Sequence, residues 1–252
     1  MLFFKKKEKI TFSLVDIGLK ADVHSHILPG VDDGSPDRDE SVAILTEFHR
    51  LGIQNVILTP HVSRSMFPNK ADDLQARFAD FVPALPETLR SQMHFHLASE
   101  YMVDDFFAAG GDRLTWPDGK HILIEMSYYE RSREIRDMIF NLQMDGLQPV
   151  LAHPERYVFY QKVFDKKNGV RELQEFFDAG CKLQLNVMSL SGAYGEASLG
   201  IVHWLLDHDM YSFIGTDVHA RRQIDHFTGF QLTAAQMDKV RGLARNNETL
   251  FG

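Results

Sequence analysis

Apolar and polar residues alternate along this chain in two different patterns. Short, nearly continuous apolar runs bounded by polar or turn residues are typical of buried strands. Longer segments between them repeat apolar residues every three or four positions, as Val42, Leu45 and Phe48 do, which predicts helices with one buried face. The expected strands cover 20–26, 54–61, 93–102, 120–126, 148–154, 181–187 and 211–217. The expected helices cover 35–52, 70–85, 134–146, 171–180, 197–209 and 233–251.

The expected helix over 35–52 carries recognisable signals at both ends. Ser35 is a suitable N-cap, because its hydroxyl can accept a hydrogen bond from a backbone N–H of the first turn, and Pro36 follows at the first helical position. Gly52 can end the helix, because glycine adopts the left-handed conformation at little cost.

About seven expected strands, most of them followed by a helix, predict an α/β fold built on a parallel sheet. The carboxyl ends of five of these strands carry side chains that commonly bind metals. An open sheet gathers functional residues mainly at one switch point, whereas a barrel presents every strand end at one mouth. The pattern therefore favours a closed or nearly closed TIM-like β/α barrel. The side chains concerned are His24 and His26, His61, Glu100, His153, and Asp217 with His219.

Two of these strand ends carry a pair of candidate ligands at alternate positions. His24 and His26 share strand parity, so both side chains can point to the same side, and Asp217 and His219 repeat this spacing. For either pair alone, a metal site and a pair of structural residues are equally acceptable interpretations. Their joint occurrence at equivalent strand ends favours the metal site.

A third pair with the same spacing, His94 and His96, is interpreted differently. These residues begin the strand expected at 93–102, several positions before Glu100. They should therefore lie at the opposite, N-terminal end of the barrel and have a structural role.

No low-complexity linker, charge block or internal repeat divides the 252 residues, and we expect a single domain over 1–252 with a leader segment over 1–19. With 44% hydrophobic and 25% charged residues, the composition is ordinary for a soluble globular protein. The net charge of −8 argues against binding of nucleic acid through a broad basic surface.

Several features of the sequence favour a cytoplasmic protein. Cys181 is the only cysteine, which rules out an intramolecular disulfide framework and fits a reducing compartment. The N-terminal apolar run precedes the first lysines and is shorter than the roughly 7 to 15 residues of a signal-peptide core. No uninterrupted apolar stretch approaches the roughly 20 residues of a membrane span, so we expect no membrane insertion.

Five short motifs carry a resemblance to a known family: "DVHSHILPGVDDG", "TPH", "SEYM", "AHPERY" and "GTDVH", in this order. They resemble the polymerase-and-histidinol-phosphatase (PHP) superfamily, and more closely its bacterial metal-dependent tyrosine-protein phosphatase branch, which is associated with capsule and exopolysaccharide operons. The likeness extends from residue 22 to about residue 222. It implies a distorted (β/α)₇ TIM-like barrel with two or three divalent ions, manganese, iron or zinc, at its C-terminal mouth. The implied metal ligands are His24, His26, His61, Glu100, His153, Asp217 and His219, together with Asp32 or Asp33.

The resemblance also implies hydrolysis of phosphate monoesters by a metal-activated hydroxide, without a cysteine nucleophile. Glu100 is the most natural bridging ligand, because it is the sole carboxylate at a central strand end. Arg156, in "HPER", can grip the phosphoryl oxygens with two N–H groups. The family places a further arginine shortly after His219, and we prefer Arg222 to Arg221 for this role.

Two other residues bear on the chemistry. Tyr128, after the strand expected at 120–126, can flank an aromatic substrate, and ordinary packing is an equally acceptable interpretation. Cys181 does not fit the cysteine-dependent tyrosine phosphatases, because they have an arginine six residues after the nucleophile, and Val187 stands there in this chain.

The substrate that the resemblance implies is a tyrosine-phosphorylated protein, specifically the tail of a bacterial tyrosine kinase. Two alternatives remain open at this point. One is a small-molecule phosphoesterase of the histidinol-phosphatase type, which would use the same metals. The other is a non-catalytic binding module that holds metal, although the intact set of ligand positions weighs against it.

Overall fold

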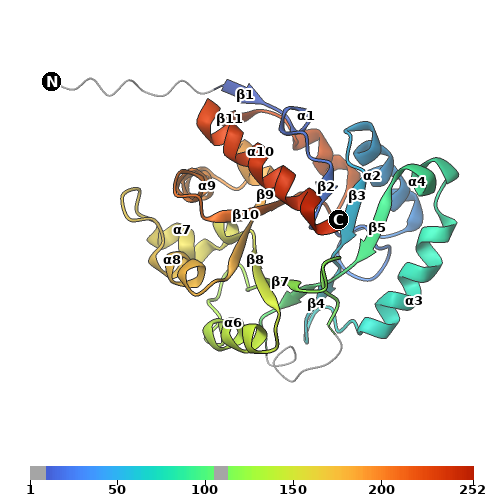
Figure 1. Ribbon diagram of the computed structural model, residues 1–252, viewed down its shortest axis with the longest axis horizontal. Coiled ribbons are helices and arrows are strands. Elements are labelled where there is room, and N and C mark those ends of the chain that lie inside the picture. The colour runs from blue at the N-terminus through green and yellow to red at the C-terminus, as the bar shows by residue number, and fades with distance from the viewer. Residues whose placement is uncertain (1–9, 105–112) are drawn as a thin grey trace.

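Parallel strands make up the centre of the structure, and helices surround them (Figure 1). The computed structural model describes residues 10–104 and 113–252. The parallel strands form a six-stranded sheet in the order β10-β9-β8-β7-β6-β4 and a three-stranded sheet in the order β2-β3-β5. They are β2 (Ala21–Asp22), β3 (Asn55–Leu58), β4 (His61–Val62), β5 (His94–Leu97), β6 (Glu100–Met102), β7 (His121–Glu125), β8 (Gln148–Ala152), β9 (Lys182–Asn186) and β10 (Tyr211–Gly215).

Two of the expected strands are each divided in the structure. The strand expected at 54–61 becomes β3 and β4, and the strand expected at 93–102 becomes β5 and β6. β3 pairs with β5, and β4 pairs with β6. Pro60 lies at the break in the first strand, where it contributes no N–H, but its carbonyl accepts from the Glu100 N–H at 3.1 Å. Each divided strand is therefore one bent segment, and the seven expected strands account for both sheets.

The first and last of these strands lie next to each other. Ser25 and Val218 form a parallel β-bridge. The Asp217 N–H donates to the His24 carbonyl at 2.7 Å, and the His26 N–H donates to the Val218 carbonyl at 2.9 Å. These bonds join the two sheets into a ring with the helices outside, so the expected barrel-type α/β fold is confirmed (Figure 1).

The helices lie on the outer side of the strands, and their bounds agree with the expected ranges to within a few residues where a helix was expected. The described α-helices are α1 (Leu14–Ile17), α2 (Arg38–Arg50), α3 (Ala71–Phe81), α4 (Glu87–Gln92), α6 (Ile135–Met144), α7 (Val158–Val163), α8 (Arg171–Asp178), α9 (Glu196–Asp207) and α10 (Ala234–Glu248). None of these described helices is both long and apolar enough to cross a membrane.

The start of α2 differs from the prediction. The N-cap is Asp37, whose side chain accepts from the Glu40 N–H at 3.0 Å. The hydroxyl of Ser35 instead donates to the Asp37 carbonyl, so the prediction of Ser35 as the cap is wrong. The end agrees with the prediction, since Gly52 follows the C-cap residue Leu51 with a φ of +90°.

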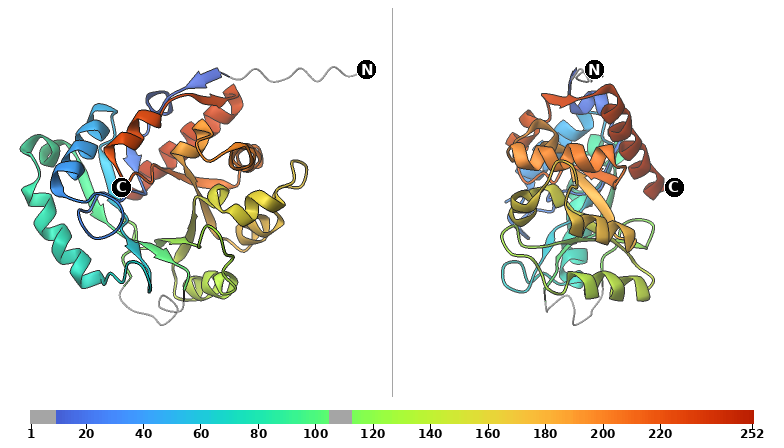
Figure 2. Two further views of the ribbon diagram at one scale, coloured as in Figure 1. Left: turned by 180° about the vertical axis from the view of Figure 1, so that it is seen from behind. Right: turned by 90° about the vertical axis from the view of Figure 1, so that its left-hand side faces the viewer.

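Part of the segment expected as a leader is folded onto the barrel. β1 (Ile10–Phe12) pairs antiparallel with β11 (Phe230–Leu232) at one edge of the molecule (Figures 1 and 2). Leu14 and Ile17 of the short helix α1 are buried. Residues 10–17 are therefore part of the folded domain, and residues 1–9 lie outside the described residues.

The interior of the barrel is filled by a small apolar cluster that is separate from the larger core between strands and helices. At its base, the rings of Trp116 and Phe213 meet edge to face with their centroids 4.9 Å apart, and both rings contact that of His121, the first residue of β7. Leu250, just after α10, packs against the same cluster. The N-terminal end of the barrel is thus packed with apolar side chains, which leaves the C-terminal mouth for polar ones.

Candidate metal centre

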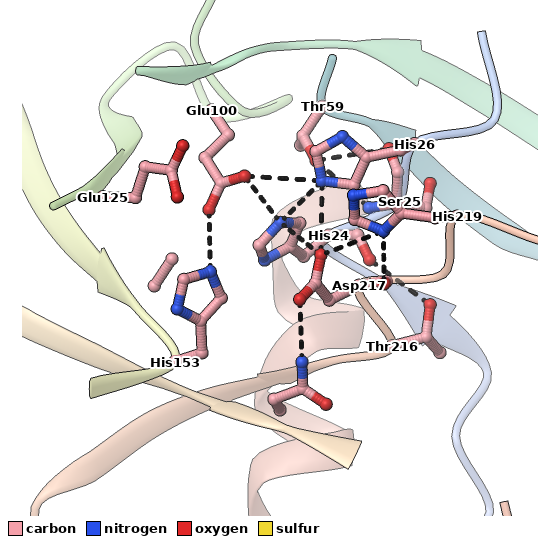
Figure 3. A network of polar contacts seen from close by, with 12 residues as sticks. His24, Ser25, His26, Thr59, Glu100, Glu125, His153, Thr216, Asp217 and His219 are labelled. Carbon is pink, nitrogen blue, oxygen red and sulfur yellow. Dashed lines mark hydrogen bonds and ion pairs between the residues drawn. The ribbon is translucent and has the colours of Figure 1, made fainter. Parts of the chain in front are cut away.

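Buried histidines and carboxylates point toward one another at the mouth of the barrel (Figure 3). The Nε2 atoms of His24 and His26 lie only 3.1 Å apart. Glu100 Oε2 lies 3.2 Å from the first of these atoms and 3.4 Å from the second. Asp217 Oδ1 lies 3.4 Å and 3.3 Å from the same two atoms. Four ligand-type atoms from three different parts of the chain therefore lie around one point.

The hydrogen-bond partner of the second ring nitrogen, Nδ1, indicates the tautomer of each of these two imidazoles. His24 Nδ1 lies 3.0 Å from Gln184 Oε1, and His26 Nδ1 lies 2.9 Å from Asp32 Oδ2. Both partners are acceptors, so both Nδ1 atoms carry a proton. In the neutral rings the two facing Nε2 atoms then present lone pairs to each other at 3.1 Å, an arrangement that a shared cation relieves. Metal-binding histidines typically have such a partner on the other nitrogen, so these residues fit a metal ion.

The electrostatics of the group also favour a cation. Burial opposes protonation of His24, but Glu100 and Asp217 outweigh it and raise the pKa of this imidazole. The pKa of His26 is raised well above its usual value against the same cost of burial, through Asp217, Asp32 and Glu100. Burial likewise opposes ionisation of the two carboxyl groups, yet the neighbouring His24 helps to hold the pKa of Glu100 and of Asp217 well below the usual range. The carboxylates thus create a negative site that metal ions can neutralise.

A second potential metal-binding group lies beside the first and includes Glu125, which the sequence did not predict as a ligand. His61 Nδ1 lies 3.1 Å from Glu100 Oε2 and 3.0 Å from Glu125 Oε1. Glu125 is the buried last residue of β7. Its position at the end of the strand expected at 120–126 was visible in the sequence, but none of the five motifs that carry the family resemblance includes it. The prediction that Glu100 is the sole carboxylate at a central strand end is therefore wrong.

The two adjacent aspartates after His26 have different surroundings. The side chain of Asp32 is buried, and its Oδ2 accepts from His26 Nδ1 at 2.9 Å and from the His61 backbone N–H at 3.0 Å. The side chain of Asp33 is 57% exposed, and its Oδ1 lies 3.5 Å from His61 Nε2 and 3.6 Å from His219 Nε2. Asp32 thus orients other residues, whereas Asp33 directs an oxygen toward two imidazole nitrogens.

His153 reaches the group through Glu100. It follows β8 in the left-handed conformation, with φ +34°, and its Nε2 lies 3.1 Å from Glu100 Oε1. The same nitrogen lies 3.5 Å from the hydroxyl of Tyr128, whose ring stacks on the imidazole. All seven histidine, glutamate and aspartate positions expected at strand ends are therefore brought together at the mouth.

Arg156 lies at the edge of the same group. Its Nη1 donates to Asp217 Oδ2, and its side chain is 17% exposed. The guanidinium carbon lies 4.7 Å from the ring centroid of Tyr128 and 4.4 Å from that of Tyr194. Burial disfavours its charge, but Asp217 outweighs this cost and raises the pKa of the guanidinium. The arginine is thus a partly buried, charged group that the ion pair and the rings hold in place.

The other two candidate arginines lie farther out. Arg221 and Arg222 begin a short 3₁₀ turn after His219, and both are exposed. Arg221 forms ion pairs with Glu47 and Asp225. Among the described residues, no hydrogen bond or ion pair joins the Arg222 side chain to the candidate metal ligands.

A cavity of about 730 Å³ leads from the surface to this group. His61, Glu125 and Asp33 belong to its lining and connect it to the buried group. Tyr128 and Phe67 also line it, and the Phe67 ring stacks on that of His61 with an interplanar angle of 11°. The cavity therefore combines aromatic side chains with candidate metal ligands, as a small-molecule or side-chain site requires.

Residues interpreted as structural lie away from this cavity. His94 is exposed at the start of β5, and His96 Nε2 lies 2.9 Å from the Thr115 carbonyl. Cys181 is buried just before β9, where burial raises the pKa of its thiol to about 12. A thiol in this form is a poor nucleophile.

A family model described as capsular polysaccharide synthesis, CpsB/CapC, matches residues 20–238. The chain belongs to the CpsB/CapC family. The matched region contains every residue of the candidate metal-binding groups, from His24 to His219. This match confirms the capsule-associated family that the sequence motifs resemble.

This CpsB/CapC protein is similar to named relatives over most of its length. It is 28% identical over 206 residues to the tyrosine-protein phosphatase CpsB of Streptococcus pneumoniae, covering 79% of this chain and 82% of the relative. It is 28% identical over 209 residues to the tyrosine-protein phosphatase YwqE of Bacillus subtilis, covering 79% and 76%.

Solved structures show the same fold. A chain from the crystal structures of B. subtilis YwqE and S. pneumoniae CpsB, described as metal-dependent tyrosine phosphatases, superposes with a TM-score of 0.69 at 23% identity, covering 91% of this chain and 93% of that one. The phosphotriesterase of Mycobacterium tuberculosis superposes with a TM-score of 0.50 at 10% identity, covering 96% and 98%. These likenesses establish a shared barrel architecture.

Proposed function

We propose that this CpsB/CapC protein is a metal-dependent tyrosine-protein phosphatase, which hydrolyses the phosphate monoester of phosphotyrosine. The buried group of His24, His26, Glu100 and Asp217, next to a cavity that reaches the surface, carries the proposal. Tyrosine-protein phosphatase is also the name of the S. pneumoniae and B. subtilis relatives.

Two or three divalent ions would be held by groups that share ligands. Imidazole and carboxylate donors suit manganese, iron and zinc alike. When bound, such ions activate water for attack on phosphorus and neutralise charge on the phosphoryl group. The groups are His24, His26, Glu100 and Asp217; His61, Glu100 and Glu125, with His153 next to Glu100; and His26, His61 and His219, with Asp33.

Arg156 would bind the phosphoryl oxygens. Its ion pair with Asp217 is the only side-chain hydrogen bond that its guanidinium makes within the described part of the chain, which leaves further N–H groups for substrate. A guanidinium presents these donors in a fixed fork that matches phosphate oxygens. Arg222 remains a second candidate for this contact, because it lies on the exposed turn just after His219.

Tyr128 would contact the aromatic ring of the substrate. It lines the cavity between the metal-binding group and the surface. Burial raises the pKa of its hydroxyl well above the usual value, so the hydroxyl stays protonated and can donate a hydrogen bond to a substrate oxygen. A phenolate is a good leaving group, so the reaction has little need of a strong general acid.

The experiment that tests this function compares three substrates with and without a chelator. We expect rapid hydrolysis of phosphotyrosine peptides, slower hydrolysis of phosphoserine peptides and of histidinol phosphate, and loss of activity on chelation or in His24→Ala. Elemental analysis of the same preparation counts and identifies the ions. Equal rates on the three substrates would favour a small-molecule phosphoesterase, and activity that survives chelation would overturn the metal mechanism.

The partner would be a tyrosine-phosphorylated protein, and the tail of a bacterial tyrosine kinase in the cytoplasm is the substrate we propose. Support comes from the membership in a family of capsular polysaccharide synthesis. Incubation with the phosphorylated kinase tail, followed by phosphotyrosine detection, tests this assignment.

A further inference from the structure

A buried carboxylate next to the metal-binding group has no part in the mechanism so far. Glu155 lies in the 3₁₀ turn Pro154–Arg156, between the proposed metal ligand His153 and the proposed phosphate-binding Arg156. It is completely buried. In the described part of the chain it forms no ion pair with lysine or arginine. A buried charge of this kind is costly unless hydrogen bonds satisfy it, so its contacts indicate what it holds in place.

The carboxylate of Glu155 ties its turn to two neighbouring strands. Oε1 accepts from the Asn186 backbone N–H at 3.0 Å and from the Ser189 hydroxyl at 2.7 Å. Oε2 accepts from the Tyr211 hydroxyl at 2.9 Å. Asn186 is the last residue of β9, and Tyr211 is the first residue of β10. The turn is thus fixed at the rim of the barrel by three donors.

Asn186, a hydrogen-bond partner of Glu155, and Arg156, its neighbour in the chain, meet at the same atom of Asp217. Asn186 Nδ2 donates to Asp217 Oδ2 at 2.8 Å, and Arg156 Nη1 donates to the same oxygen. The other oxygen of Asp217, Oδ1, faces the Nε2 atoms of His24 and His26. The two oxygens of this carboxylate therefore have separate partners, and the donors on Oδ2 determine how Oδ1 is presented.

We propose that Glu155 is a positioning residue. It holds Arg156 and Asn186 against Asp217 Oδ2 and so directs Asp217 Oδ1 toward the Nε2 atoms of His24 and His26. Arg156 is its neighbour in the chain, and Asn186 is its hydrogen-bond partner, so one carboxylate sets the separation of the two groups. The part of this proposal that concerns phosphate binding rests on the proposed phosphatase function. The part that concerns the metal ligands does not.

The test uses two substitutions of Glu155. Glu155→Ala removes all three acceptor contacts, whereas in Glu155→Gln the amide oxygen can still accept from the Asn186 N–H and the Ser189 hydroxyl. We expect Glu155→Ala to lower metal retention and kcat/KM on an aryl phosphate, each by roughly 10-fold to 100-fold, the range for residues that orient metal ligands. We expect Glu155→Gln to restore both to within a few-fold of the unmodified protein.

Ser189→Ala and Gln236→Ala complete the set. Ser189→Ala removes one donor to Glu155 Oε1 and should reduce metal retention by a few-fold, which keeps the test available if Glu155→Ala fails to fold. Gln236→Ala is the matched control: Gln236 is a buried polar residue of α10 that donates to Asp207 at 3.1 Å, away from the barrel mouth. It should lower Tm without changing metal retention or kinetics.

Metal retention is measured by elemental analysis after dialysis against graded chelator, alongside Tm, kcat and KM. The proposal is overturned if the Glu155 and Ser189 variants lose Tm alone, as the control does. It is also overturned if Glu155→Gln is as defective as Glu155→Ala, because charge rather than geometry would then matter. If the unmodified protein is inactive on every phosphoester, the proposed function is wrong. The metal retention of the variants would still decide the role of Glu155.

Discussion

Alanine substitutions of Asp32 and Asp33 should separate two roles that adjacent carboxylates have in this site. Asp32→Ala leaves three donors without an acceptor: His26 Nδ1–H and the backbone N–H groups of His61 and Gly34. An unsatisfied buried donor costs about 1 to 3 kcal/mol, and the backbone groups are only partly buried, so the lower end of this range applies and the total is about 3 kcal/mol. For a chain of this length that loss lowers Tm by roughly 6 to 12 °C.

Asp33→Ala should behave differently. The Asp33 side chain is 57% exposed, so its loss should change the free energy of unfolding by no more than about 0.5 kcal/mol. Its oxygen faces His61 and His219, so we expect loss of metal from that group and loss of phosphatase activity with an almost unchanged Tm.

The assay is thermal unfolding of both variants in the presence of chelator, because bound metal adds stability to the folded state and would hide the difference. His26 outweighs the cost of burial and holds the pKa of Asp32 below its usual value of 3.8. The stability that Asp32 provides is therefore present above pH 3.8 and lost as pH falls further, so the deficit of Asp32→Ala should shrink in acid. A Tm loss that is equal in the two variants, or larger for Asp33→Ala, would refute this division of roles.

Three further outcomes are expected. Cys181→Ser should keep kcat/KM within about twofold, since the thiol is buried and away from the cavity, and a larger loss in a phosphotyrosine peptide assay would count against a metal mechanism. In metal-free protein, burial and His26 oppose protonation of His61, but Glu100 and Glu125 raise its pKa from 6.5 to about 10. The contribution of His61 to stability is therefore complete below pH 6.5 and lost as pH rises toward 10. Tm should fall over this range, and the fall should be smaller in His61→Ala. Arg156→Lys should lower kcat/KM by about 100-fold, because an ammonium lacks the fork of donors, and near-normal kinetics would exclude phosphate binding by Arg156.

The strand-end histidines could be predicted because extended chain has a strict period of two. His24 and His26 reveal a shared side through spacing alone, and the alternation of strands and helices brings their end of the chain to the same mouth as Asp217. Glu125 was not predicted, because it has no such spacing and, unlike Glu100, lies in none of the motifs that carry the family resemblance. Its contact with His61 comes from the bend between β3 and β4, which only tertiary pairing defines.

The choice between Asp32 and Asp33 could not be made from the sequence for a similar reason. A turn allows either residue to face inward, and the outcome depends on the backbone N–H groups of His61 and Gly34, which bond to Asp32. The N-cap of α2 shows the same limit on a smaller scale. Ser35 and Asp37 are both good caps, and the chain around Ser35 buries its hydroxyl instead.

Closure of the ring has a consequence for the order of events during synthesis. Thr216 bonds to Asp22, 194 residues earlier, and Asn247 of α10 bonds to the Ala21 carbonyl, 226 residues earlier. The chain emerges from the ribosome N-terminus first, so His24 and His26 are made long before Asp217, and the ligand set is complete only when most of the protein has been translated. An interrupted chain that stops before β10 therefore has both an open barrel and an incomplete ligand set. Phosphatase activity should appear only after translation of β10 and of Asp217, which follows it.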